Sequence, residues 1–160
     1  MNEELLHAQL QHHWSGATGG VAFFDRVART HADPDAAAKL RLMAEENDED
    51  RETLREIMLS VGVKPSRLGA ATARAGEWLA RFKPNGRVVR RSPLTDVLEL
   101  EALRLAISGK RVGWQFLTAL AEHDRRLDRT HLDGLVKRAD AQLNQLHDIH
   151  LRVALARVLE

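Results

Sequence analysis

Residues 33–66 read DPDAAAKLRLMAEENDEDRETLREIMLSVGVKPS, and this stretch decides the fold class. Asp33 is a good helix N-cap, and Pro34 suits the first helical position, so a helix is expected to begin here. Gly62, with a proline three residues later, is typical of a helix C-terminus. The residues in between are good helix formers. The stretch therefore predicts one long helix over 34–61.

The core-facing positions of this helix alternate in steps of three and four residues, which is the spacing of a seam that packs against other helices. The seam consists of Ala36, Leu40, Met43, Asn47, Asp50, Leu54, Ile57 and Val61. Two polar residues, Asn47 and Asp50, thus take seam positions in the middle of the helix. Such a pair is either part of a ligand site or part of a hydrogen-bonded layer that fixes helix register.

Three further helices are predicted by the same spacing, over about 3–30, 93–122 and 129–158. The seam of the first consists of Leu6, Leu10, His13, Ala17, Val21, Phe24 and Ala28. The seam of the second consists of Leu94, Val97, Leu98, Glu101, Leu105, Val112, Phe116 and Ala119. The seam of the third consists of Leu132, Leu135, Ala139, Gln142, Leu146, Ile149 and Val153. Without strand patterns or repeats, the chain is expected to form one all-α domain over 1–160.

The connections between these helices predict their topology. The first and third connections are short, so each flanking pair of helices is expected to be antiparallel. Residues 63–92 form a much longer connection, which can return the chain along the bundle. The expected fold is an up-and-down four-helix bundle with one long crossover, in which the second and third helices run parallel. Within the crossover, residues 70–82 are expected to form a short helix that carries Trp78.

The order of short, long and short connections, with the stretch MAEENDEDRETLREIMLSVGVKPS at 43–66, resembles the ferritin-like superfamily over nearly the whole chain. The resemblance implies a metal site with one glutamate from each of two helices and a Glu-x-x-His motif from each of the other two. Asn47 and Asp50 stand where the second helix would carry such a motif. The matching level of the first helix has no carboxylate, and His13 is the nearest inward candidate there.

The candidate metal ligands are Asp50, Glu101, His147 and His150, with His13, Asn47 and Gln142 lining the same layer. Iron and manganese require anionic oxygen ligands, and two carboxylates with neutral amides do not balance two divalent ions. We therefore predict a decayed metal site and no cofactor, with bound iron or manganese as the alternative. Glu101 and His150 lie at similar depths and could pair with each other without a metal.

Two further features have alternative interpretations. Glycine and alanine gather on the first helix around Gly16 and Gly20, and on the third around Gly109 and Gly113. These small faces indicate a close approach of the two helices, or space for a ligand or a tryptophan ring. The crossover from Lys64 onward carries eight basic residues and one acidic residue. It is either a phosphate or nucleic-acid patch, or a segment that lies over the acidic second helix, and we favour the second interpretation because no nucleic-acid motif accompanies the charge.

Composition excludes several functions. The chain has no cysteine, which excludes disulfides, thiolate metal sites, iron–sulfur clusters and cysteine nucleophiles, and fits a reducing cytoplasm. No signal-peptide pattern or membrane-spanning apolar run is present, and the net charge of +1 does not attract nucleic acid. The sequence predicts a cytoplasmic, homodimeric, non-enzymatic binding or interaction module. The alternative is a metal-dependent oxidoreductase or iron-handling protein with unusual ligands.

Overall fold

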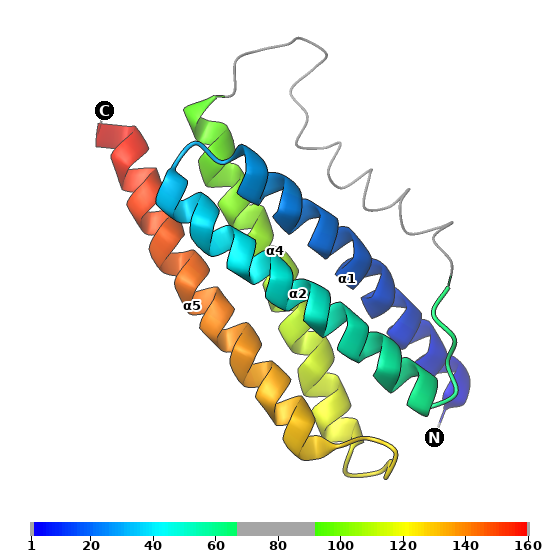
Figure 1. The fold of residues 1–160 in the computed structure, drawn as a ribbon. Helices are drawn as coiled ribbons and strands as arrows, with labels where there is room; N and C mark the ends of the chain where they lie inside the picture. The colour runs from blue at the N-terminus through cyan, green and yellow to red at the C-terminus, as the bar shows by residue number, and fades with distance from the viewer. Residues whose placement is uncertain (1, 67–91, 160) are drawn as a thin grey trace.

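The computed structural model describes residues 2–66 and 92–159. These residues contain four helices and no strand: α1 (Glu3–Thr30), α2 (Pro34–Ser60), α4 (Pro93–Leu120) and α5 (Arg129–Leu159) (Figure 1). The helix bounds differ from the predicted ones by at most two residues. The predicted crossover helix with Trp78 and most of the basic connection lie outside the described residues. The described part of the chain is thus all-helical, as predicted.

Side chains cap the helices where the sequence predicts helix ends. The carboxylate of Asp33 accepts a hydrogen bond from the backbone N–H of Ala36 at 2.7 Å. Asn2 and Ser92 cap the starts of α1 and α4 in the same way. Each cap satisfies a backbone N–H that the first helical turn leaves without a partner. Beyond the end of α2, Gly62 has a φ of 83°, in the left-handed region that glycine adopts without strain.

Paired side chains fix the directions of the helices. Along the α1–α4 interface, Arg26 pairs with Glu99, and the His13 ring lies against Gly113, so these two helices are antiparallel. Ion pairs between α2, with its N-cap, and α5 include Asp33–Arg152 and Asp50–Arg138. Ion pairs between α4 and α5 include Glu101–His150 and Arg111–Asp140. Since α5 is antiparallel to both α2 and α4, those two helices run in the same direction, and both begin at the end of the bundle where the C-terminus lies (Figure 1).

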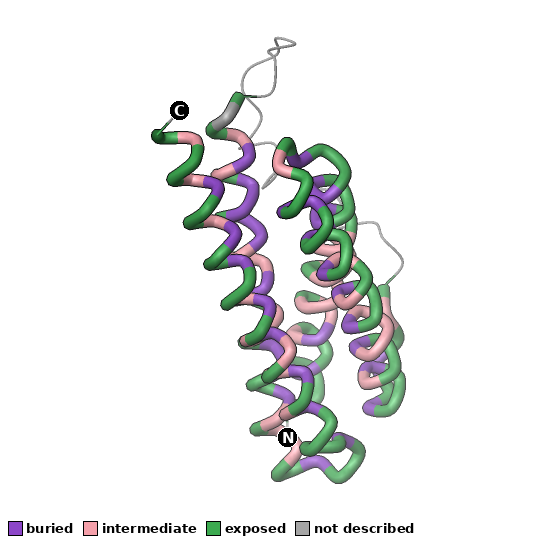
Figure 2. The backbone as a smooth tube through the Cα atoms, turned by 60° about the vertical axis from the view of Figure 1, so that its left-hand side comes forward, coloured by how far each residue is buried: buried purple, intermediate pink, exposed green. Residues whose placement is uncertain are grey.

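The core lies between the four helices, whose inner sides carry most of the buried positions (Figure 2). The predicted seams of α2 and α5 are confirmed, because every position in them is buried except Ile57, which is half-buried. The predicted seam of α1 is buried at both ends and half-buried in the middle, from His13 to Val21. Seven-residue spacing in the sequence was therefore sufficient to orient these three helices.

The predicted seam of α4 is wrong. Five of the six large apolar residues assigned to it are 37–64 % exposed, and they are Leu94, Leu98, Leu105, Val112 and Phe116. The sixth, Val97, is half-buried and packs against the core. The buried side of α4 instead carries Leu100, Leu103, Ile107, Trp114 and Leu117. The helix has apolar residues on two opposite faces, and the repeat at positions 98, 105 and 112 favoured the outer one. Glu101, predicted to point inward, is exposed for the same reason.

One of the small residues on α4 marks a close contact with α1. A Cβ atom added to Gly113 would lie 2.8 Å from two atoms of the His13 ring, so glycine makes room for that ring. The sequence did not predict histidine as the group that fills this space. By contrast, a Cβ atom added to Gly16, Gly20 or Gly109 would have no neighbouring atom within 4 Å. Close packing therefore explains Gly113 but not the other three glycines.

Candidate functional site

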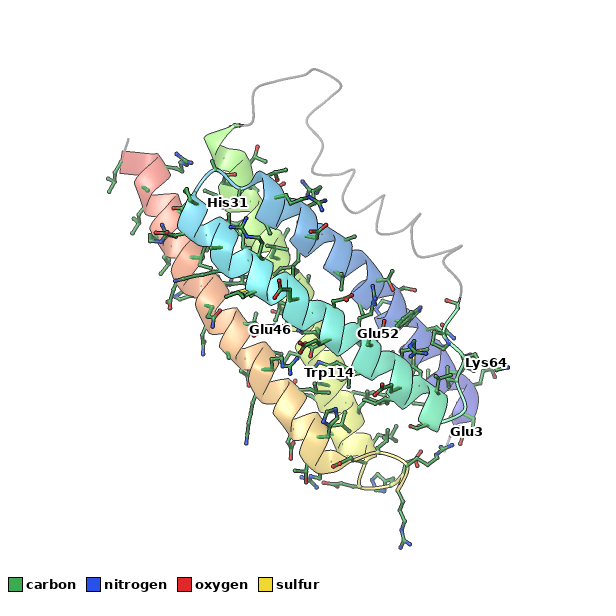
Figure 3. All side chains as sticks on the ribbon, in the orientation of Figure 1. Glu3, His31, Glu46, Glu52, Lys64 and Trp114 are labelled. Carbon is green, nitrogen blue, oxygen red and sulfur yellow. The ribbon has the colours of Figure 1, made fainter. Side chains whose placement is uncertain are left out.

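A polar layer crosses the middle of the bundle, and the ammonium group of Lys110 lies at its centre. Lys110 is on the inner side of α4, one turn before the buried Trp114 that Figure 3 labels. Its Nζ donates hydrogen bonds to Asn47 Oδ1 at 2.7 Å, to Asp50 Oδ2 at 2.5 Å and to Gln142 Oε1 at 2.6 Å. An ammonium has three N–H bonds, so its donors are all used. Lys110 therefore ties α4 to both α2 and α5.

Both amides in this layer have a second hydrogen bond that orients them. Asn47 Nδ2 donates to the backbone oxygen of Met43 at 2.6 Å. Gln142 Nε2 donates to Glu46 Oε2, also at 2.6 Å, and Figure 3 labels Glu46 on α2. Because each NH₂ group has its own acceptor, each carbonyl oxygen is turned toward the ammonium of Lys110. The layer is thus a connected network with consistent donor and acceptor roles.

Arg138 of α5 completes the network on the side of Asp50. Its Nη1 donates to Asp50 Oδ1 at 3.0 Å and to Glu49 Oε2 at 3.1 Å. The two oxygens of Asp50 therefore bind two different cations, Lys110 on one side and Arg138 on the other. Glu49 is largely exposed, so this chain of ion pairs runs from the surface to the interior. A buried carboxylate is tolerated only when it is paired in this way.

Burial and charge act in opposite directions on Lys110. Its side chain is 14 % exposed, and the side chain of Asp50 is 2 % exposed. Loss of hydration lowers the pKa of Lys110, because burial disfavours the charged form. The adjacent carboxylate of Asp50 raises that pKa, but the net direction is downward. The site is therefore an internal ammonium whose positive charge is stabilised mainly by Asp50.

The structure brings together three of the predicted layer residues, Asn47, Asp50 and Gln142. It does not bring Glu101, His147 and His150 to them. Glu101 Oε1 lies 3.2 Å from His150 Nε2, and the Glu101 side chain is 52 % exposed. These two residues thus form the pair that was predicted as a metal-free alternative. His147 is exposed on α5.

His13, the candidate on α1, belongs to a different contact. Its ring covers Gly113, and its Nε2 lies 3.1 Å from Gln9 Nε2. Burial lowers the pKa of His13, and the neighbouring His12 lowers it further. His13 therefore packs between α1 and α4, and the polar partner of its ring is Gln9 of its own helix.

The donor groups in the layer do not fit a dinuclear metal site. The carboxylate of Asp50 is bonded to two protein cations, and the oxygens of Asn47 and Gln142 are directed at an ammonium. Divalent iron or manganese needs several anionic oxygens and is repelled by nearby positive charge. Over residues 2–66 and 92–159, no three or more His, Asp or Glu side chains are grouped so that they could hold a metal ion.

The sequence contained a signal for the residue that was missed. The buried side of α4 advances in steps of four, three, four and three residues, through Leu103, Ile107, Lys110, Trp114 and Leu117. This is the same seam spacing that identified Asn47 and Asp50 on α2. Lys110 was not identified because the outer face of α4 also has a regular apolar seam, and Lys110 is not part of that seam. Arg138 is at the edge of the α5 seam, where its long side chain reaches inward while its base stays near the surface.

Comparisons with family models, with curated proteins and with solved structures find no match for this chain. Among the described helices, none combines the length and apolar character needed to cross a membrane. The polar layer and the surfaces of the bundle are therefore the features from which a function can be inferred.

Proposed function

We propose that this chain is a ferritin-like, up-and-down helical bundle with a long crossover, and that it acts as a non-enzymatic binding or interaction module. In this proposal, the ammonium of Lys110 takes the place that bound metal has in metal-binding members of that superfamily. The observation that carries the proposal is the set of three oxygens, from α2 and α5, within 2.5–2.7 Å of Lys110 Nζ. The parallel α2 and α4 support the ferritin-like topology. A cytoplasmic location and the absence of a nucleic-acid partner belong to the same proposal.

An ammonium differs from a metal ion in what it can do at this position. It is covalently attached to α4, has no open coordination position and cannot polarise a substrate as a Lewis acid does. Its three donors are used by Asn47, Asp50 and Gln142. The ammonium therefore offers no free donor to a reactant. This favours a structural role for the layer, in which three directional contacts fix the register of α4 against α2 and α5.

Two hollows of the described surface lie away from the layer. One, of about 200 Å³, is lined by Ile57, Arg126 and His131 at the end of the bundle where α5 begins. Another, of about 360 Å³, is lined by Val97, Ala154 and Arg157 at the opposite end. Neither is lined by Lys110 or Asp50. These two hollows therefore do not open onto the polar layer, although active sites are usually concave.

Metal analysis of the full chain tests this proposal. The protein should be purified without chelator, and its iron and manganese content should be measured by mass spectrometry. We expect far less than one ion per chain. The matched variants are Asp50→Asn, inside the layer, and Glu101→Gln, an exposed carboxylate outside it, and neither should change the metal content. One or two ions per chain that are lost in Asp50→Asn but kept in Glu101→Gln would overturn the proposal in favour of a metal-dependent oxidoreductase or iron-handling protein.

A further inference from the structure

One helix of the bundle, α4, has an outer apolar face whose members are 37–64 % exposed. Its members lie on the side opposite the buried Leu103 and Ile107, and they are Leu94, Leu98, Leu105, Val112 and Phe116. From the first to the last of these residues the row extends about 33 Å, at the helical rise of about 1.5 Å per residue. Exposed leucines scattered singly are ordinary, but a continuous apolar row along a helix is typical of a contact surface.

The spacing of this row is symmetric about Leu105. Leu98 and Val112 lie seven residues before and after it, and Leu94 and Phe116 lie eleven residues before and after it. A two-fold axis through Leu105 would therefore place Leu98 opposite Val112 of a second copy, and Leu94 opposite its Phe116. Self-complementarity of this kind is what a two-fold interface requires, because the same surface must serve both subunits. A partner with a different sequence would impose no such symmetry.

We propose that the outer face of α4 binds the same face of a second copy of this chain, in antiparallel orientation, with Leu105 on the two-fold axis. This inference deepens the proposed function, because it names the partner of the interaction module. The seven-residue spacing around Leu105 is that of a helix–helix seam, in which apolar side chains of one helix fit between those of the other.

The charges beside the row are compatible with this arrangement. Glu101 and Arg111 both lie on the flank of α4 that faces α5, where they pair with His150 and Asp140 respectively. Glu101 is four residues before Leu105, and Arg111 is six residues after it. The two-fold axis brings the same flanks of the two copies together. Along the helix axis, Glu101 of one copy then lies within about two residues of Arg111 of the second copy. Glu101 of each copy therefore has an opposite charge near it at the rim, which is compatible with this orientation.

The mass of the full chain in solution tests whether this dimer exists. Light scattering or sedimentation equilibrium should give twice the chain mass of 18.0 kDa. Leu105→Glu places two carboxylates against each other on the axis and should weaken association roughly a hundredfold or more. The matched control is Leu42→Glu on α2, because Leu42 is 63 % exposed and Leu105 is 64 % exposed. The control should remain a dimer, and circular dichroism should show both variants folded.

Cysteine cross-linking tests the orientation, because the chain has no cysteine of its own. Leu105→Cys should form a disulfide-linked dimer by itself. Leu98→Cys should cross-link when it is mixed with Val112→Cys but not by itself. In a parallel pairing, Leu98→Cys would cross-link efficiently by itself, and this result would overturn the proposed geometry.

Two further results would overturn the dimer itself. One is a wild-type mass of 18.0 kDa, which would mean that the face is free or binds another kind of partner. The other is a dimer that survives Leu105→Glu, whatever the state of Leu42→Glu. Metal content measured on the same samples separates this inference from the proposed function, because a metal-free monomer would contradict the docking surface without restoring a metal site.

Discussion

The Nζ atom of Lys110 and the Oδ2 atom of Asp50 lie 2.5 Å apart in the middle of the bundle, and this ion pair joins α4 to α2. An unpaired buried carboxylate is costly, so Asp50 needs an internal partner. The structure shows two partners, Lys110 and Arg138. The carboxylate that was a candidate metal ligand therefore balances positive charge that the protein itself supplies.

The first prediction concerns the coupling between these two residues. Lys110→Met should lower the free energy of unfolding by about 3 kcal/mol, because it removes one cation from a buried pair and leaves amide oxygens without donors. Asp50→Asn should have a cost of similar size, since it leaves Lys110 and Arg138 close together without the carboxylate between them. Urea unfolding followed by circular dichroism measures both changes.

The double variant provides the control for this prediction. Lys110→Met with Asp50→Asn removes both charges of the pair, so its cost should be smaller than the sum of the two single costs by about 1 kcal/mol or more. If the two costs simply added, Lys110 and Asp50 would not be coupled, and the ion pair would not explain the burial of either side chain.

The second prediction is a pH dependence at the alkaline end. Burial lowers the pKa of Lys110 in the folded protein below its ordinary value of 10.5. Between that lowered pKa and 10.5, the unfolded chain binds more protons than the folded chain, so this group makes stability rise as pH rises. Below the lowered pKa, both states are protonated and the contribution is constant. Urea unfolding across this window should show a more positive slope in the wild type than in Lys110→Met.

The absence of tyrosine and cysteine makes that comparison clean, because neither phenol nor thiol groups titrate in the same window. Equal slopes in the wild type and in Lys110→Met would show that Lys110 keeps its ordinary pKa in the folded state. The paired carboxylate of Asp50 would then compensate fully for the loss of hydration.

Much of the fold could be predicted from the sequence, because local signals agree with the overall structure. The Asp33-Pro34 start and the Gly62 end of α2 are local features, and both are present where they were expected. On α2 and α5, one face of the helix is clearly more apolar than the other. The sequence therefore also specifies which face of each of these helices meets the bundle. Asn47, Asp50 and Gln142 were found in this way.

The rest could not be predicted because α4 is apolar on two faces. Spacing alone does not say which face meets the bundle, and the face with Leu98, Leu105 and Val112 was the more regular of the two. That choice placed Glu101 inside the bundle and Lys110 outside it. The predicted site therefore had a carboxylate where the structure has a cation. The choice between two such faces depends on contacts with α1, α2 and α5, whose contacting residues are distant in sequence.

The third prediction uses two glycines of α4 with different surroundings. Replacing a helical glycine with alanine is worth up to about 1 kcal/mol when the new methyl group has space. Gly109 has such space, since no atom would lie within 4 Å of its Cβ, so Gly109→Ala should be stabilising. In Gly113→Ala the methyl group would lie 2.8 Å from the His13 ring, so this variant should be neutral or destabilising.

A second-site change tests the cause of that difference. His13→Ala removes the ring, so Gly113→Ala should become stabilising in that background, while the effect of Gly109→Ala should stay the same. Thermal unfolding of the five variants and the wild type measures this. If Gly113→Ala is as stabilising as Gly109→Ala in the wild-type background, the His13 ring does not pack against Gly113.

The fourth prediction concerns Asp33, which serves two helices at once. Its side chain caps α2 through the Ala36 amide and pairs with Arg152 of α5. The hydrogen bond from Arg152 is the largest cause that lowers the pKa of Asp33, to about 2 from an ordinary 3.8. A depressed carboxyl pKa adds stability that is present above the unfolded value of 3.8 and is lost as pH falls through about 2. Allowing for solvent screening, this contribution is about 1 kcal/mol.

Asp33→Asn and Asp33→Ala separate the cap from the ion pair. Asparagine still accepts the Ala36 hydrogen bond but carries no charge for Arg152, so Asp33→Asn should lose about 1 kcal/mol at neutral pH and flatten the acid dependence in that window. Asp33→Ala should lose about a further 1 kcal/mol, because the first turn of α2 also loses its cap. Asp25→Asn is the control, since Asp25 pairs with Arg29 at an exposed position of α1 and should change stability little. If Asp33→Asn kept the acid dependence of the wild type, other carboxylates would be responsible for it. The link between the start of α2 and the end of α5 would then contribute little to the stability of the bundle.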